Sequence, residues 1–76
     1  MIGPTFVAQF SDGTITRMTT HCGKGLDLAR GIKLSRDAYE IRHKKSAPAI
    51  LSGRFEEAVS GALLEEYDTA AIEALK

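Results

Sequence analysis

A short turn sequence between two strand-like runs constrains the fold of this chain most strongly. Asp12 and Gly13 stand between two runs. In residues 6–10, Phe6, Ala8 and Phe10 alternate with Val7 and Gln9, and residues 15–20 are rich in β-branched types. Aspartate followed by glycine is typical of a type I′ turn, in which both central residues take positive φ. The pattern therefore predicts a β-hairpin over residues 6–20 with a type I′ turn at Asp12 and Gly13.

The segment 26–45 follows a glycine-containing break and has helical spacing of its apolar residues. Gly31 weakens the middle of such a helix by up to about 1 kcal/mol relative to alanine, and Ser35 suits an N-cap. Two short helices meeting near residues 31–35 are therefore an alternative to one long helix. The expected apolar stripe comprises Leu28, Ala29, Ile32, Ala38, Tyr39 and Ile41.

Residues 49–67 fit two structures. Their short apolar runs predict a second hairpin that turns near Gly61 and pairs with the first, but residues 55–66 also fit a helix. We favour the hairpin because glycine costs more inside a helix than beside a turn. A short final helix is expected to begin at Asp68 or Thr69. The chain is thus predicted to form one small α+β domain over residues 1–76, in the order ββαββα, with about four antiparallel strands and one main helix packed on one face of the sheet.

The composition narrows the setting of the protein. Cys22 is the one cysteine of 76 residues, so an internal disulfide is excluded, and a cytoplasmic, reducing compartment is expected. The sequence has no apolar run of the roughly 20 residues that a membrane span needs, and it begins without the basic and apolar regions of a signal peptide. A membrane partner is therefore not expected.

The charges are divided unevenly along a chain whose net charge is zero. Residues 1–45 carry eight lysines and arginines against four acidic residues, and residues 46–76 carry two against six. We favour the interpretation that the two halves neutralise each other within one fold. The alternative is that the asymmetry promotes self-association as a homodimer, or binding to a partner with the same asymmetry.

No residue pattern predicts catalysis, a metal or a cofactor. His21 and Cys22 are neighbours that point to opposite sides of an extended chain, and with His43 they lack zinc-ligand spacing. Gly23-Lys24-Gly25 lacks the further residues of a phosphate-binding loop. The pairs Glu56-Glu57 and Glu65-Glu66 are interpreted as solvated acidic faces. The protein is therefore predicted not to be an enzyme.

Residues 28–42 resemble a helix-turn-helix, with Leu34 at the turn and Ser35 opening a second helix. The segment departs from that motif at Lys33, where a turn glycine is usual, and at Arg42, where an apolar residue is usual. The preferred prediction is a small non-enzymatic interaction module that binds another protein or itself. The alternative is a nucleic-acid-binding regulator. The candidate partner-binding residues are Lys33, Arg36, Arg42, Lys44 and Lys45.

We predict that Cys22→Ser and His21→Ala leave stability and partner binding nearly unchanged, because neither residue belongs to a site that the sequence supports. Thermal unfolding and metal analysis of the purified variants test this prediction. Loss of bound zinc or of an enzymatic activity in either variant would contradict it.

Overall fold

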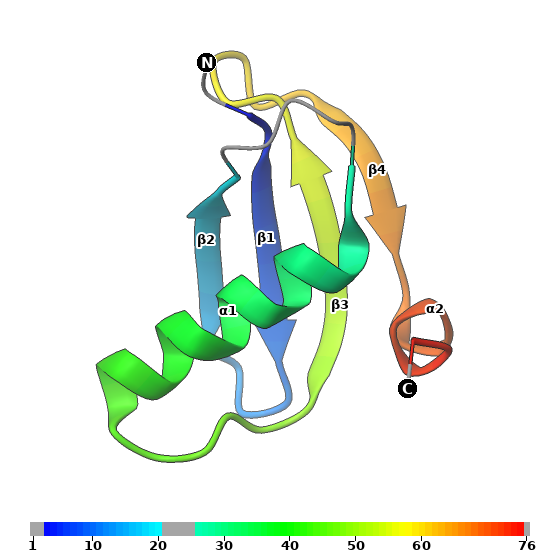
Figure 1. Cartoon of the computed structure of the whole chain (residues 1–76). Helices are drawn as coiled ribbons and strands as arrows, with labels where there is room; N and C mark the ends of the chain where they lie inside the picture. The colour runs from blue at the N-terminus through cyan, green and yellow to red at the C-terminus, as the bar shows by residue number, and fades with distance from the viewer. Residues whose placement is uncertain (1–2, 21–25, 76) are drawn as a thin grey trace.

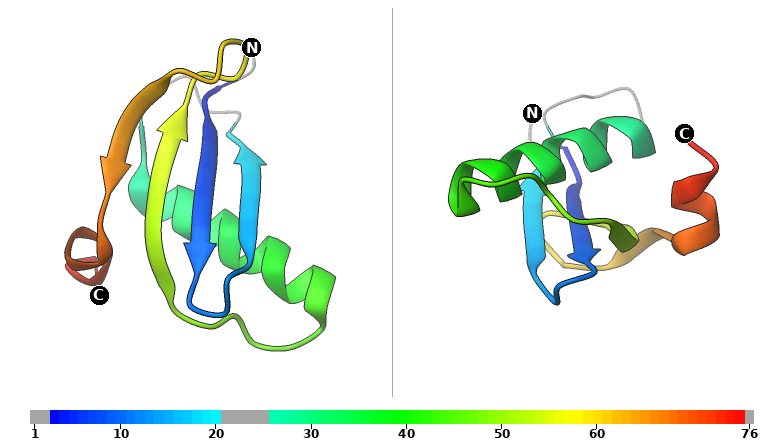
Figure 2. Two further views of the ribbon diagram at one scale, coloured as in Figure 1. Left: turned by 180° about the vertical axis from the view of Figure 1, so that it is seen from behind. Right: turned by 90° about the horizontal axis from the view of Figure 1, so that it is seen from below.

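The computed structural model describes residues 3–20 and 26–75. Its elements are β1 (Thr5–Phe10), β2 (Ile15–Thr19), α1 (Leu28–His43), β3 (Ile50–Glu56), β4 (Leu63–Tyr67) and α2 (Thr69–Glu73). The strands form one antiparallel sheet in the order β2-β1-β3-β4. Helix α1 crosses one face of this sheet, and α2 lies at the end of β4 (Figures 1 and 2). The predicted α+β fold of order ββαββα, with one main helix on one face, is confirmed.

Both predicted hairpins are present, but the first turn differs from the prediction. Gly13 has a φ of 91° and donates its N–H to the Phe10 carbonyl over 3.0 Å, whereas Asp12 does not have positive φ. The predicted type I′ turn is therefore wrong. The loop is the three-residue type, in which only the final glycine is left-handed. In the second hairpin, Gly61 has a φ of 73° and bonds back to Glu57, so the helical alternative for residues 55–66 is also wrong.

Helix α1 is continuous from Leu28 to His43. Asp27 caps its N-terminus by accepting a hydrogen bond from the backbone N–H of Arg30 over 3.2 Å. Ser35 is not an N-cap but is buried in the middle of the helix against the sheet. The two-helix alternative and the helix-turn-helix resemblance are both wrong, because there is no break at residues 31–35.

Phe6 explains why a glycine is found in the middle of α1. A Cβ atom added to Gly31 would lie 2.8 Å from Cγ of Phe6, and one added to Gly53 of β3 would clash with the far end of the same ring. The ring of Phe6 therefore fills the space that the two missing side chains leave between helix and sheet. The conformational cost of Gly31 in a helix is offset by this close packing.

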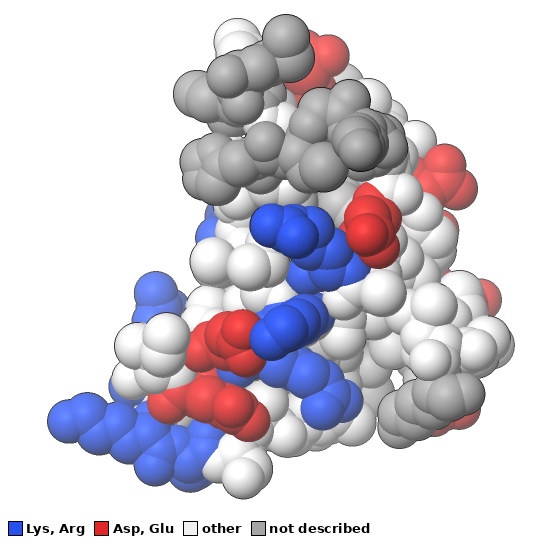
Figure 3. Space-filling view, viewed as in Figure 1, with Lys and Arg blue, Asp and Glu red and all other residues white. Residues whose placement is uncertain are grey.

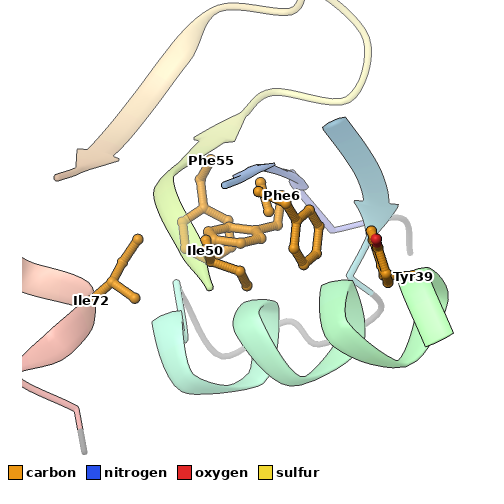
Figure 4. Close-up of a cluster of buried hydrophobic side chains, with 7 residues drawn as sticks. Phe6, Tyr39, Ile50, Phe55 and Ile72 are labelled. Atoms are coloured by element: carbon orange, nitrogen blue, oxygen red, sulfur yellow. The ribbon is translucent and has the colours of Figure 1, made fainter. Parts of the chain in front are cut away.

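The core lies between α1, α2 and the face of the sheet that they cover (Figure 4). Its buried members are Phe6, Ala8, Phe10, Tyr39, Ile50, Phe55 and Ile72. On α1, the buried line runs through Gly31, Ser35 and Tyr39, with Leu28 and Ile32 partly buried. Ala29 and Ile41 were expected in the apolar stripe, but both are exposed. They lie to the side of the residues of α1 that face the sheet.

A polar contact ties the first hairpin to α1. The hydroxyl of Tyr39 donates a hydrogen bond of 2.6 Å to Asp12, whose other carboxylate oxygen accepts the backbone N–H of Thr14. The ring of Tyr39 also contacts two other rings, and the centroids of Phe10 and His43 lie 4.8 Å and 4.2 Å from its own. The bond from Tyr39 lowers the pKa of Asp12 to about 2 and raises the pKa of Tyr39.

Gly31→Ala is expected to destabilise the protein by about 1 kcal/mol, because overpacking in a core typically costs more than the gain in helix propensity. Urea unfolding measures the effect. In a Phe6→Leu background the same substitution is expected to be neutral or stabilising, since the smaller side chain makes room for the methyl group. A stabilising Gly31→Ala in the wild-type background would show that Phe6 does not restrict this position.

The Asp12–Tyr39 hydrogen bond is expected to stabilise the folded state at neutral pH, and this contribution to the free energy of unfolding is expected to disappear in acid. The pKa of Asp12 falls from 3.8 to about 2 on folding, so the unfolded state binds more protons between these values and stability decreases as the pH falls through them. Asp12→Asn is expected to lose stability at neutral pH and to show a shallower loss in acid. Tyr39→Phe, which keeps the Asp12 carboxylate and removes the donor of the bond, should show the same shallower loss in acid.

A candidate protein-binding groove at the edge of the sheet

Strand β2 forms one free edge of the sheet, and α1 overhangs it. The C-terminal turns of α1 extend past β2, beyond the edge of the sheet (Figures 1 and 2). Between them lies a groove of about 250 Å³, which we call the β2 groove. It is lined by Ile15, Thr16, Arg17, Met18, Ala38 and Arg42. The small side chain of Ala38 leaves room for a backbone to approach the strand beneath the helix.

The hydrogen-bond alternation of the first hairpin shows which backbone groups face this groove. Phe10 bonds to Thr14, and Thr20 bonds to Pro4, at the two ends of the β1–β2 ladder. Bonded and non-bonded pairs alternate in an antiparallel ladder, so every second residue of β2 turns its N–H and C=O away from β1. These outward-facing residues are Ile15, Arg17 and Thr19.

The charged side chains that line the β2 groove are both cationic. Arg42 reaches it from α1, and Arg17 reaches it from the opposite face of the sheet. Arg17 bonds to Glu56 over 3.1 Å, but its side chain remains 61% exposed. Within residues 3–20 and 26–75, Arg42 forms no ion pair. Thr16 adds a buried hydroxyl with no hydrogen-bond partner in the same part of the chain.

The face of the sheet opposite α1 is covered by its own side chains. Val7 lies between Arg17 and Arg54 in the strand register and is only 2% exposed. Both arginines bond to Glu56, Arg54 over 2.6 Å. The bond from Arg54, assisted by that from Arg17, lowers the pKa of the Glu56 carboxyl. The stems of the two arginines thus cover Val7, so the middle of this face presents polar groups.

A second, larger groove of about 430 Å³ lies between the two helices. It is lined by Ala29, Ile32, Lys33, Arg36, Asp37, Glu40, Ile72 and Leu75. Its charged side chains have both signs, and Lys33 and Asp37 form an ion pair of 3.4 Å across one turn of α1. Its helical walls bond their backbone groups internally, apart from the helix ends. This interhelical groove therefore offers fewer free backbone N–H and C=O groups than the β2 groove.

The five candidate binding residues do not form one surface. Lys33 and Arg36 line the interhelical groove, and Arg42 lines the β2 groove. Lys44 is the C-cap of α1, with a left-handed φ of 56°, and the charge of Lys45 acts on Asp12. Acidic side chains interrupt the basic ones over the face of α1 (Figure 3). The helical spacing of the sequence is enough to put Arg42 on a different side of α1 from Lys33 and Arg36. That Arg42 lies beside an edge strand follows only from the strand order.

The fold keeps part of the basic first half of the chain away from part of the acidic second half. The strand order places β2 and α1, from the first half, away from β4, from the second half. In the part of the chain that the structure describes, Arg17–Glu56 is the one ion pair that joins the two halves. Among residues 3–20 and 26–75, ion pairing between the two halves is therefore limited to that contact.

The opposite free edge, β4, has a different character. Leu63, Leu64, Glu65 and Glu66 are all exposed, and Tyr67 is partly buried against Phe55. Exposed charged side chains are a common protection of edge strands against pairing with other chains. Grooves of about 260 Å³ and 300 Å³ also lie beside β4, and each is lined by a glutamate, Glu66 or Glu57. The β2 groove differs from them because its charged side chains are all cationic.

Of the residues considered for catalysis or metal binding, none that the structure describes lines the β2 groove or the interhelical groove. His21, Cys22 and Gly23-Lys24-Gly25 lie outside the described residues. His43 stands at the exposed end of α1 against the ring of Tyr39. Among the described residues, no three of His, Cys, Asp and Glu gather as a metal site would require. None of the described helices has the length and apolar character to cross a membrane.

The comparisons with known proteins assign this chain to no family. The chain matches no protein-family model, no curated protein and no solved structure.

Proposed function

We propose that this protein is a small non-enzymatic interaction module that binds an extended segment of another protein, or of a second copy, by strand addition to β2. The observation that carries the proposal is the set of outward-facing backbone groups on β2 beneath the overhang of α1. An added strand pairs with such groups through its main chain, and the neighbouring groove accepts its alternate side chains. A cytoplasmic, reducing compartment, which a single cysteine favours, is part of this proposal.

The alternative of a nucleic-acid-binding regulator has less support. Phosphate binding benefits from basic side chains gathered on one surface, whereas the candidate lysines and arginines divide between two grooves and the end of α1. The five aromatic side chains are buried or partly buried on the covered side of the sheet or beneath α1, so they form no exposed platform for stacking bases. We therefore expect no tight binding of duplex DNA at physiological salt.

Strand addition predicts an alternating pattern of amide protection. In the presence of a millimolar strand-forming peptide, the amides of Ile15, Arg17 and Thr19 are expected to exchange more slowly, because each gains a hydrogen bond. The amides of Thr16 and Met18 already bond to β1 and should change little. Hydrogen exchange followed by NMR makes the measurement.

A matched pair of variants locates the binding site. Ala38→Phe fills the β2 groove and should abolish the protection, whereas Ala29→Phe makes the same change on α1 in the interhelical groove and should preserve it. Protection that appears without peptide and grows with protein concentration identifies a second copy as the partner. Strand addition would be refuted if the peptide protected no amide of β2, or protected only amides of residues that line the interhelical groove.

A further inference from the structure

We infer that the segment bound by β2 carries two adjacent acidic residues, one for each arginine of the groove. This inference rests on the proposed function, which leaves the chemistry of the partner open. The charged groups that line the β2 groove are Arg17 and Arg42, and no acidic residue lines it. A neutral or basic strand would leave Arg17 with Glu56 alone and would add no partner for Arg42, while an acidic strand would pair with both.

The two arginines approach the added strand from opposite faces. Thr16 and Met18 pair with Ala8 and Phe6, whose side chains face α1, so the intervening Arg17 lies on the face away from the helix. Arg42 belongs to α1 and lies on the helix side. Successive side chains of a strand also point to opposite faces. Two neighbouring acidic residues therefore direct one carboxylate toward Arg42 and the other toward Arg17.

Each arginine has donors to offer a carboxylate. A guanidinium has five N–H donors, and the ion pair of Arg17 with Glu56 involves a single contact at 3.1 Å. Arg42 forms no ion pair with any acidic residue of the described segments. A carboxylate beneath α1 also lies on the side of the buried, unpartnered hydroxyl of Thr16, which lines the same groove.

The closing experiment compares three blocked hexapeptides with the frame threonine-valine-X-X-valine-threonine, in which both X residues are glutamate, glutamine or lysine. Their affinities are measured by NMR titration of the full chain, with Ile15, Arg17 and Thr19 as reporters. The glutamate peptide is expected to bind about tenfold more tightly than the glutamine peptide, as two partly exposed ion pairs allow. The lysine peptide is expected to bind most weakly.

Substitutions and salt test the assignment to the arginines. Arg42→Glu should remove most of the preference for the glutamate peptide, while Arg36→Glu, the same change on the other side of α1, should keep it. A test on the wild-type protein does not depend on a variant being folded. There, raising the salt concentration from about 50 mM to about 500 mM should also reduce the preference for the glutamate peptide.

Each remaining outcome decides between the two proposals. Equal affinity of the glutamate and glutamine peptides overturns the acidic-pair inference and leaves strand addition standing. A lysine peptide that binds most tightly, or concentration-dependent protection by a second copy alone, overturns the acidic-pair inference in the same way. If no peptide and no second copy protects the outward-facing amides of β2, both proposals are wrong.

Discussion

The position of α1 depends on one aromatic ring held between two glycines. Because Gly31 and Gly53 have no side chains, the helix and β3 both approach Phe6 closely, and the ring is fully buried between them. The overhang of α1 beyond β2 follows from where this contact holds the helix on the sheet (Figure 1). Close packing in a small core leaves little freedom to shift, so the width of the β2 groove is tied to a contact in the middle of the molecule.

The sequence predicted the architecture because the turns are marked locally. Glycines at residues 13 and 61 are left-handed in the two hairpin turns, and Asp68 caps α2 as expected. The turn type was wrong because Phe10 pairs with Thr14, which leaves three residues in the loop rather than two. The bond from Tyr39 to Asp12, 27 residues away in the sequence, was not predictable from the turn sequence. Helix propensity records the cost of Gly31 but not the ring that it faces, so the helix appeared divisible when it is continuous.

The candidate site was predictable only in part. Arg42 was among the candidate residues, but Arg17 and Ala38 were not, because their importance depends on β2 being an edge strand beneath a helix. A sequence pattern can predict that a segment is a strand, but it does not show whether that strand lies at the edge of the sheet. Lys33 and Arg36 were grouped with Arg42 as one basic surface, and the geometry of α1 separates them.

The leucines and glutamates of β4 have a consequence for the behaviour of the protein at high concentration. When two copies meet through this edge, Leu63 and Leu64 favour contact, while Glu65 and Glu66 bring like charges together on both molecules. These carboxylates therefore oppose the pairing of two copies through β4, as charged side chains on edge strands commonly do. Side chains of β4 itself thus disfavour growth of the sheet past this edge, independently of the groove at the other edge.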